Sequence, residues 1–408
     1  MLNILVNAYA VNPYWGSEQG LGWNWVINLA NYCNVYIITE GEFRDNIENE
    51  IQYLPQKENI HFYYNPLPDR IRKMCWNQGD WRFYWYYQKW QKKTLELAQN
   101  IIAKNKIDII HQLNMIGFRE PGYLWKIKDI PFVWGPIGGM ELVPVNYLTG
   151  VPIKQKVIVY LKNILNNYQT KHDRRVYKAI NHASQLIAAV KGVKEKIELI
   201  YKKDVLLLNE TGCKVNGYIS HNPKNDYLKI LWVGKFDFRK QLGLAINIIA
   251  KLKDLKIEFH IVGGGTEVEE KQYKKLAYEL GIDLICHWHG VIKNEEVQKL
   301  MRESDLLLFT SIMEGTPHVV LEAISNCLPV LCFDACGQSA SVNNKVGIKV
   351  KLTSTNQSIN DFATQIRYLS KNREVLANMS TACVERQEEL SWNSKAQQMV
   401  EIYHSILK

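Results

Sequence analysis

The stretch DLLLFTSIMEGTPHVVLEAISNCLPVLCFD (305–334) decides the fold of this chain. Two apolar runs, DLLLFTS (305–311) and LPVLCFD (328–334), enclose a helical pattern over 316–326. Short apolar runs separated by a helix of this length are typical of parallel strands that are joined by a crossover helix. The stretch therefore predicts a strand, a helix and a strand within a parallel sheet whose faces are covered by helices.

The same alternation fills most of the chain before this stretch. Strands are predicted at 227–234, 257–263 and 284–290, and helices at 240–253, 267–280 and 294–303. The first half repeats the pattern, with strands at 3–10, 35–39, 60–65, 107–113, 130–135, 184–190 and 204–209, and helical patterns at 19–32, 81–104, 155–180 and 191–202. Two such series predict an α/β protein with two Rossmann-like, doubly wound parallel-sheet domains that face a cleft.

The length of 408 residues also favours two domains. We expect a first domain at 1–215, a linker at 216–226 that contains the turn signal SHNP, and a second domain at 227–385. The terminal segment 386–408 ends in the amphipathic sequence SWNSKAQQMVEIYHSILK (391–408). This helix is expected to pack on the second domain or to cross back to the first.

The composition is that of an ordinary globular protein, with 47% hydrophobic and 22% charged residues. The first residues lack the basic region of a signal peptide, and the longest apolar runs are far too short to span a bilayer. Eight scattered cysteines without a CxxC pair favour free, buried thiols. We therefore expect a cytoplasmic protein.

The net charge of +9 is concentrated in the first half of the chain. Residues 1–225 contain 28 lysines and arginines against 19 acidic residues, whereas residues 226–408 contain 22 of each. This surplus predicts an anionic partner, for which a membrane surface, a phosphorylated acceptor or a nucleic acid would serve. A solvated, lysine-rich surface is the alternative.

The most informative motif is EGTPHVVLEA (314–323), which connects the predicted strand to its helix. The helix start consists of Gly315, Thr316, Pro317, His318 and Val319. Free backbone N–H groups and the positive end of the helix dipole would bind a diphosphate there. Glu314 and Glu322 lie at the two ends of that turn, and their carboxylates are strong acceptors for sugar and ribose hydroxyls. Singly, each glutamate could be an ordinary loop or helix residue, but the complete string indicates a nucleotide-sugar site.

In these residues the chain resembles the retaining glycosyltransferases of family 4, which have the GT-B fold. Their signature is E-G-x-P-x-x-x-x-E-A followed by G-x-P-V. This chain has EGTPHVVLEA followed by NCLPV (326–330), so Asn326 and Cys327 depart from the signature. The resemblance implies that Glu314 contacts the transferred sugar, that Glu322 contacts the ribose, and that transfer proceeds with retention at the anomeric carbon.

A second motif follows the first strand of the second domain. The family has G-R-x-x-x-x-K-G at this point, and this chain has GKFDFRKQ (234–241). The resemblance assigns Lys240 to the diphosphate. It also places Lys235 at the usual arginine, which keeps the charge but loses the bidentate fork, so Arg239 is a substitute cation. Basic residues are otherwise disfavoured at a helix N-terminus, which supports a bound anion.

The first domain offers weaker signals. GSEQGLGW (16–23) opens a helix after the first strand and resembles the family's glycine loop, in which Gly16 would lie close to the donor. A tight turn is the alternative for this segment. His111 ends a strand at which the family has a histidine that touches the transferred sugar, and a structural histidine is equally compatible with the sequence.

WGPIGG (134–139) ends the next strand of the first domain. Gly135, Gly138 and Gly139 are expected to line the acceptor side or to turn the chain.

Other patterns carry less weight. VGGGTE (262–267) lacks the G-x-G-x-x-G spacing of a dinucleotide site. His287 and His289 share one strand face, but no third ligand is evident in the sequence, so structural histidines are favoured over a metal site. No D-x-D triplet occurs, so we expect no metal cofactor and assign neutralisation of the diphosphate to the basic motif.

The stretch WNQGDWRFYWYYQKW (76–90) is dense in aromatic and basic residues. Such a stretch suits a membrane interface, the stacking of sugars, or a buried helix with a polar rim. Because it lies in the basic half, a peripheral contact with an anionic membrane is a further hypothesis.

Together these features predict a metal-independent glycosyltransferase with Glu314, Lys240 and His111 as its catalytic residues. Its donor would be a nucleotide diphosphate sugar and its acceptor a glycan or lipid-linked glycan, in surface polysaccharide or lipopolysaccharide synthesis. No nucleic acid partner is expected. The alternatives are a nucleotide-sugar epimerase or phosphorylase of the same fold, and a non-catalytic nucleotide-sugar-binding partner of another transferase.

Overall fold

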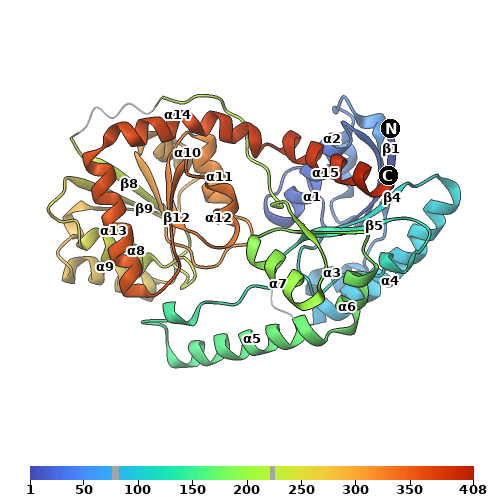
Figure 1. The fold of residues 1–408 in the computed structure, drawn as a ribbon, viewed down its shortest axis with the longest axis horizontal. Helices are drawn as coiled ribbons and strands as arrows, with labels where there is room; N and C mark the ends of the chain where they lie inside the picture. The colour runs from blue at the N-terminus through green and yellow to red at the C-terminus, as the bar shows by residue number, and fades with distance from the viewer. Residues whose placement is uncertain (76–81, 221–225) are drawn as a thin grey trace. The chain divides into compact units, whose positions relative to one another are not determined.

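The structure is a computed structural model that describes residues 1–75, 82–220 and 226–408 (Figure 1). Most of the predicted turn SHNP lies outside these ranges, as do Trp76 and Trp81 of the aromatic stretch. The chain folds into two compact units. The first unit comprises residues 1–141, 165–211 and 392–408, and the second comprises residues 142–164 and 212–391.

The first unit contains a seven-stranded sheet in which every strand pairing is parallel. Its strands follow the order β3-β2-β1-β4-β5-β6-β7. They are β1 (Leu2–Ala8), β2 (Cys33–Thr39), β3 (Ile60–Tyr64), β4 (Ile109–Asn114), β5 (Phe132–Ile137), β6 (Gln185–Ala188) and β7 (Val205–Leu207). The main helices of the first half are α1 (Ser17–Leu29), α2 (Arg44–Ile51), α3 (Asp69–Cys75), α4 (Arg82–Lys104), α5 (Ile153–His172), α6 (Arg174–His182) and α7 (Lys191–Tyr201).

The second unit contains a six-stranded parallel sheet in the order β10-β9-β8-β11-β12-β13. Its strands are β8 (Leu228–Val233), β9 (Ile257–Val262), β10 (Cys286–Gly290), β11 (Leu306–Phe309), β12 (Val330–Phe333) and β13 (Gly347–Val350). The helices that follow them are α8 (Leu242–Ala250), α9 (Glu267–Glu279), α10 (Asn294–Glu303), α11 (His318–Ser325), α12 (Cys336–Ser341), α13 (Thr355–Lys371) and α14 (Arg373–Glu389). The last helix, α15 (Trp392–Leu407), belongs to the first unit.

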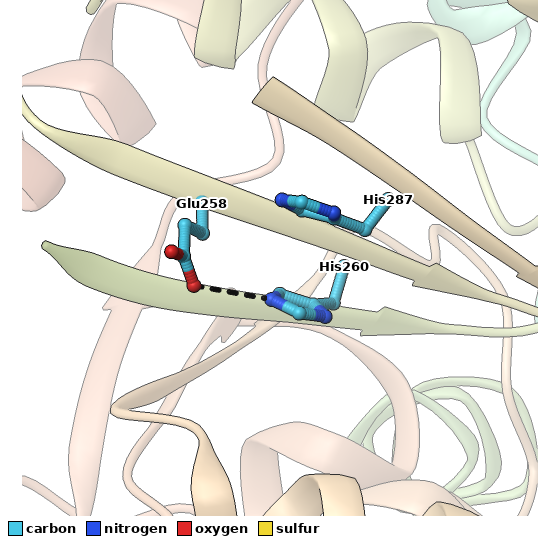
Figure 2. A group of neighbouring side chains, drawn as sticks. All are labelled: Glu258, His260 and His287. Carbon is cyan, nitrogen blue, oxygen red and sulfur yellow. Dashed lines mark ion pairs between the residues drawn. The ribbon is translucent and has the colours of Figure 1, made fainter. Parts of the chain in front are cut away.

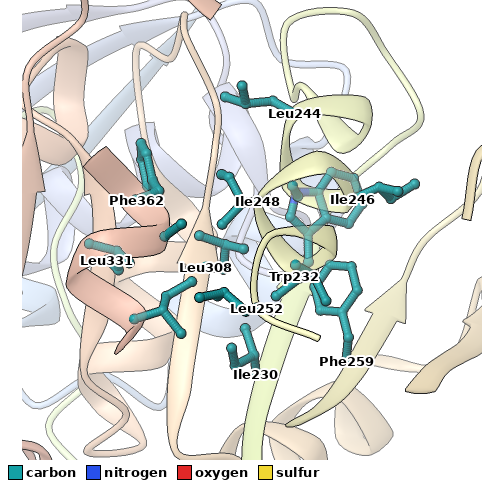
Figure 3. Close-up of a cluster of buried hydrophobic side chains, with 14 of the residues drawn as sticks. Ile230, Trp232, Leu244, Ile246, Ile248, Leu252, Phe259, Leu308, Leu331 and Phe362 are labelled. Atoms are coloured by element: carbon teal, nitrogen blue, oxygen red, sulfur yellow. The ribbon is translucent and has the colours of Figure 1, made fainter. Parts of the chain in front are cut away.

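Successive side chains of each strand point to opposite faces of the second sheet, and helices cover both faces. Ile230, Trp232 and Phe259 point to one face, where they form a buried cluster with apolar residues of α8 and α13 (Figure 3). Leu231 and Leu307 point to the other face and pack with residues of α10 and α11. Because both faces are apolar, the strands are nearly continuous hydrophobic runs, as parallel strands require.

Helix α15 packs on α1 within the first unit. The indole of Trp25 meets that of Trp392 edge to face, with ring centroids 5.8 Å apart, and the Tyr32 hydroxyl donates to Asn393. The buried ammonium of Lys395 donates to the carbonyl oxygen of Asn209 at 3.0 Å. The amphipathic pattern at 391–408 therefore corresponds to a helix whose apolar side is buried in the first unit.

Seven cysteine side chains are described, and all seven are buried and free of disulfides. In the described ranges, every helix is too short or too polar to cross a membrane.

Candidate active site

The strand order of the second sheet reverses between β8 and β11, which lie side by side although two strands separate them in the sequence. At such a switch point the loops that follow the two strands diverge to opposite faces, and open parallel sheets bind their ligands there. The loop after β8 contains the predicted basic motif, and the loop after β11 contains EGTPHVV. The topology thus brings the two strongest sequence motifs to one place.

Lys240 and Glu314 meet at this point. The Lys240 ammonium donates to the Glu314 carboxylate as an ion pair, and both side chains are largely buried. The same carboxylate oxygen accepts a hydrogen bond from the Ser311 hydroxyl at 2.8 Å. The residues that the sequence assigned to the transferred sugar and to the diphosphate are therefore direct partners.

Hydrogen bonds between the loops hold this pair in place. The Thr310 hydroxyl donates to the Lys240 carbonyl oxygen at 2.8 Å and accepts from the Trp232 indole at 3.0 Å. The backbone N–H of Ile312 donates to the Arg239 carbonyl oxygen at 2.9 Å. The position of Lys240 relative to Glu314 is therefore set by backbone and core contacts as well as by their charges.

Backbone donors follow Glu314 directly in the sequence. Helix α11 begins at His318, and the N–H groups of Gly315, Thr316 and Val319 have no protein acceptor among residues 1–75, 82–220 and 226–408. These donors add to the positive end of the helix dipole. An anion that reached Lys240 would find unsatisfied N–H groups beside it.

Two further residues support the loop and were missed at the sequence level. The Gly337 N–H donates to the Glu314 carbonyl oxygen at 3.1 Å, and the buried Gln338 amide donates to the Ser311 carbonyl oxygen at 3.0 Å. A Cβ on Gly337 would lie 2.3 Å from the Gly315 carbonyl oxygen, so only glycine fits. Their one sequence signal is their place after β12, the strand next to β11.

Glu322 is not in contact with Glu314. Its carboxylate accepts hydrogen bonds from Asn294 and Gln298, at the start of α10. Burial raises the pKa of Glu322, and these hydrogen bonds oppose that rise. In this structure Glu322 therefore joins α11 to α10, with its ribose contact remaining a prediction from resemblance.

The other two basic residues of the motif differ in their surroundings. Arg239 forms an ion pair with Asp237, with 2.7 Å between Nη2 and the nearer carboxylate oxygen. Lys235 is exposed, and it makes no ion pair with any residue that the structure describes. Lys240 is thus the basic side chain of this motif that pairs with Glu314, whereas the Lys235 ammonium is exposed to solvent.

In the first unit, the predicted glycine loop caps α1. Gly16 is the exposed N-cap residue, and an added Cβ would have open space around it. Gly20 and Gly22 differ, because a Cβ on either would lie 2.2 Å from a backbone carbonyl oxygen. The close approach expected of a glycine loop is therefore made here to the protein's own backbone.

His111 is completely buried, and both its ring nitrogens are engaged. Nδ1 lies 2.6 Å from the Tyr403 hydroxyl and Nε2 lies 2.6 Å from the Gly135 carbonyl oxygen. Burial lowers the pKa of His111 to about 4, so the ring is neutral. Of the two roles that the sequence left open, this geometry favours the structural one.

The three glycines of WGPIGG have different surroundings. A Cβ on Gly135 would lie 2.3 Å from the Ile187 carbonyl oxygen, and Gly138 is buried beside Ile116. Gly139 is exposed with a φ of +80°. Gly135 and Gly138 therefore serve packing, and Gly139 is the one of the three that a ligand could reach.

Most of the described aromatic stretch lies on α4. Tyr87 and Trp90 are buried and stack with ring centroids 5.9 Å apart, whereas Tyr84 and Trp85 are exposed. The buried-helix interpretation accounts for the first pair, and the second pair forms an exposed aromatic rim.

Comparison with solved structures identifies the class of fold. The apo form of the lipopolysaccharide outer core galactosyltransferase WaaB superimposes with a TM-score of 0.65 at 14% identity, over 98% of this chain and 99% of that chain. Anabaena HepE in complex with UDP and glucose gives a TM-score of 0.58 at 15% identity, over 99% and 100%. Two parallel-sheet, Rossmann-like domains of this kind constitute the GT-B fold, as the sequence predicted.

Sequence comparison identifies the family of the second unit. Residues 218–386, which lie within the second unit, match the family of glycosyl transferases group 1. An uncharacterized glycosyltransferase of Methanocaldococcus jannaschii is 20% identical over 317 residues, which cover 76% of this chain and 78% of that protein. A lipopolysaccharide 1,6-galactosyltransferase of Salmonella typhimurium is 29% identical over 163 residues, which cover 38% of this chain and 44% of that protein.

Proposed function

We propose that the chain is a retaining glycosyltransferase that moves a sugar from a nucleotide diphosphate sugar to a glycan or lipid-linked acceptor. One observation carries the proposal: the Lys240–Glu314 ion pair lies beside N–H groups that lack protein acceptors, within a group 1 glycosyltransferase domain. An ammonium and free N–H groups fit a diphosphate, and a carboxylate fits sugar hydroxyls.

Donor binding would proceed by exchange of partners. In the structure, Lys240 and Glu314 neutralise each other. A diphosphate that arrives at the N–H groups of α11 competes for the Lys240 ammonium, because it carries more charge than one carboxylate. Glu314 is then released to accept hydrogen bonds from the sugar. Binding of the donor thus prepares the carboxylate that orients the group to be transferred.

The chemical step breaks the bond between the anomeric carbon and the phosphate oxygen and forms a bond from that carbon to the acceptor oxygen. Positive charge develops on the sugar and negative charge on the leaving diphosphate. Lys240 and the N–H groups of Gly315, Thr316 and Val319 stabilise the leaving charge. The leaving phosphate oxygen takes the acceptor proton on the same face, which gives retention without a side-chain base.

The substrates can be narrowed by the similar proteins. HepE was solved with UDP and glucose, and WaaB is a lipopolysaccharide galactosyltransferase. We therefore infer a UDP-sugar donor and an acceptor from surface polysaccharide or lipopolysaccharide synthesis. Because Lys240 and backbone donors supply the positive charge at the diphosphate, transfer is expected to need no metal ion.

The test is nucleotide binding followed by transfer. UDP, GDP, ADP and CMP are titrated calorimetrically into the full chain in EDTA, and the best ligand is repeated with Lys240→Met. We expect one nucleoside diphosphate to bind, and the variant to bind it at least about 100-fold more weakly, as the loss of a charge-assisted contact implies. Equal affinity in wild type and Lys240→Met would overturn the site, and binding without sugar transfer to any glycan acceptor would favour a non-catalytic partner.

An anionic membrane surface is the proposed location of the acceptor. Helix α5 carries Lys154, Lys156, Lys162 and Lys171 and no acidic residue. Its exposed apolar side chains include Ile153, Leu161, Ile164 and Leu165, which are 80%, 60%, 65% and 53% exposed. Lysines beside exposed aliphatic side chains on one helix are typical of a segment that lies in the interface of an anionic bilayer.

Vesicle sedimentation tests this surface. The wild-type chain should bind vesicles that contain phosphatidylglycerol and not vesicles of phosphatidylcholine alone, and the binding should weaken with salt. Charge reversal of Lys154, Lys162 and Lys171 to glutamate should abolish it. The matched control reverses Lys271, Lys274 and Lys275, which are exposed on α9. Equal loss in both triple variants would show a general charge effect and overturn the assignment to α5.

A further inference from the structure

Three ionisable side chains gather on the edge of the second sheet, outside the candidate active site. Glu258 and His260 are on β9, and His287 is on the edge strand β10 (Figure 2). One potential ligand atom from each lies within 4.8 Å of the other two. Glu258 and His260 are half-buried, and His287 is exposed. The cluster is open to solvent on the side of His287.

The sheet register explains why these residues meet. His260 and His287 are paired across β9 and β10, so their side chains point to the same face. Glu258 is two residues before His260 on the same strand and therefore shares that face. The register shifts after Trp288, and this irregularity places His289 against His260, with Nε2 of His289 3.0 Å from Nδ1 of His260.

We infer that Glu258, His260 and His287 form a binding site for a divalent transition metal, with Zn²⁺ the best match. Two imidazoles and a carboxylate are a ligand set that zinc uses when a fourth position stays open to water. Ligand atoms on a zinc ion lie about 3.3 Å apart, because each bond is about 2.0–2.1 Å long. The three ligand atoms now lie within 4.8 Å of one another, so a bound zinc ion would have to draw the side chains closer together.

The hydrogen bond to His289 suits this role. If Nδ1–H of His260 donates to Nε2 of His289, the Nε2 lone pair of His260 is left for the metal. That Nε2 atom is buried and makes no hydrogen bond with the described residues, and a Glu258 carboxylate oxygen lies 3.6 Å from it (Figure 2). Metal-binding histidines commonly donate their other ring N–H in this way, which fixes the tautomer.

One neighbour opposes the metal. The Lys229 ammonium, on β8, lies 3.7 Å from the Glu258 carboxylate oxygen. It competes with a cation for Glu258 and must move away or lose its pair when a metal binds. The site is therefore expected to bind a cation more tightly when Lys229 is replaced by an uncharged residue. The metal would join β9 to the edge strand β10, and this stabilising role is independent of the proposed transfer reaction.

The test is metal titration of the full chain without an affinity tag, after dialysis against EDTA. Calorimetry with Zn²⁺ should show one site per chain, and Co²⁺ should give the visible absorption of a tetrahedral complex. His260→Ala and His287→Ala should each weaken binding at least about 100-fold, and His289→Ala about 10–100-fold, as for residues that orient a ligand. Lys229→Met should bind more tightly than wild type.

The matched control is His404→Ala, which removes an exposed histidine outside the cluster and should leave the Zn²⁺ affinity unchanged. His287 is exposed, so its variant should fold, and circular dichroism checks this. Zn²⁺ should raise the melting temperature of wild type but not of His287→Ala. Wild type that binds no Zn²⁺, or His287→Ala and wild type that bind it equally, would overturn the site.

Discussion

At the scale of single residues, we expect one substitution in the Lys240–Glu314 pair to change UDP affinity and transfer rate in opposite directions. Glu314→Gln removes the carboxylate that competes with the diphosphate for Lys240, so the affinity for UDP should rise several-fold. The same variant loses the acceptor for the sugar hydroxyls, so transfer should fall by about 100-fold or more. Calorimetry with UDP and initial transfer rates measure the two effects.

The control for that substitution is Glu295→Gln, an exposed glutamate on α10, which should change neither quantity. If Glu314→Gln weakened UDP binding as much as Lys240→Met does, Glu314 would be a structural support for the loop and the exchange of partners would be wrong.

Glu18 makes stability depend on pH. Burial raises its pKa to about 7, and its buried Oε2 has no hydrogen-bond partner in the described ranges. The native state therefore binds this proton more tightly than the unfolded chain does. The bound proton of Glu18 contributes its full stabilisation below about pH 4.5, and this stabilisation is lost as the pH rises through about 7. A shift of this size corresponds to about 3 kcal/mol.

Glu18→Gln should remove this loss. The variant should match wild type near pH 4.5 and exceed its unfolding free energy by up to about 3 kcal/mol at pH 8, as measured by urea titration at both pH values. The exposed Glu58→Gln should show no such difference. A parallel pH dependence in wild type and Glu18→Gln would show that Glu18 is ionised without cost.

The sequence motifs pointed to Glu314 and Lys240, but not to the residues that hold their loops in place. Glu314 and Lys240 belong to motifs with a readable chemistry. Ser311 and Gly337 act through a hydroxyl and a missing Cβ, and such roles depend on which loops meet, which the sequence does not show. The same holds for the proposed metal site. Glu258 and His260 lie on β9, and the sequence does not show that β9 pairs in this register with β10, the strand of His287.

At the scale of elements, α15 contributes Tyr403 as the hydrogen-bond partner of His111 on β4. The Tyr403 hydroxyl is the partner of His111 Nδ1, and both side chains are fully buried. Tyr403→Phe leaves that nitrogen without a partner and should cost about 1–3 kcal/mol of unfolding free energy. Transfer by the folded protein should stay near the wild-type rate, because the contact is structural.

The comparison is Tyr32→Phe, which removes a solvent-exposed hydrogen bond between the segment after α1 and α15 and should cost less than about 1 kcal/mol. A large loss of transfer in Tyr403→Phe, with stability intact, would instead indicate that His111 acts on the substrate.

Periodicity predicted most elements within a few residues, and the helix at 294–303 has the predicted ends. The helical patterns predicted near 155–180 correspond to α5 and α6, and Asp173 caps the N-terminus of α6. Strand β13 and helices α12, α13 and α14 were not predicted. GIKV is only four residues long, and α14 alternates small and polar residues with few large apolar ones, so neither gives a strong periodic signal.

At the scale of the whole molecule, each unit has its own hydrophobic clusters. One cluster of the second unit contains Trp232 and Phe333, and one of the first contains Trp90 and Trp134. The residues proposed to bind the diphosphate all belong to the second unit. We therefore expect two calorimetric unfolding transitions, of which UDP raises only one. A single transition that shifts as a whole with UDP would show that the units unfold together.

Periodicity alone does not assign residues 142–164 and 392–408 to units. Residues 142–164 follow a first-half strand, yet they group with the second unit, where the Tyr147 hydroxyl lies 2.7 Å from that of Ser358. The amphipathic pattern at 391–408 was compatible with packing on either domain. Such assignments rest on contacts between distant parts of the chain, which periodicity does not encode.

The division of the chain between units also sets an order for folding during synthesis. The first unit begins with β1 but needs α15, including Tyr403, to close its core. The second unit needs only residues up to 391, so its part of the chain is complete before the residues of α15 are synthesised. Over that interval, the surface that Tyr403 and Met399 will cover is open to chaperones, and a stop codon before residue 392 would leave the first unit, not the second, exposed to proteolysis.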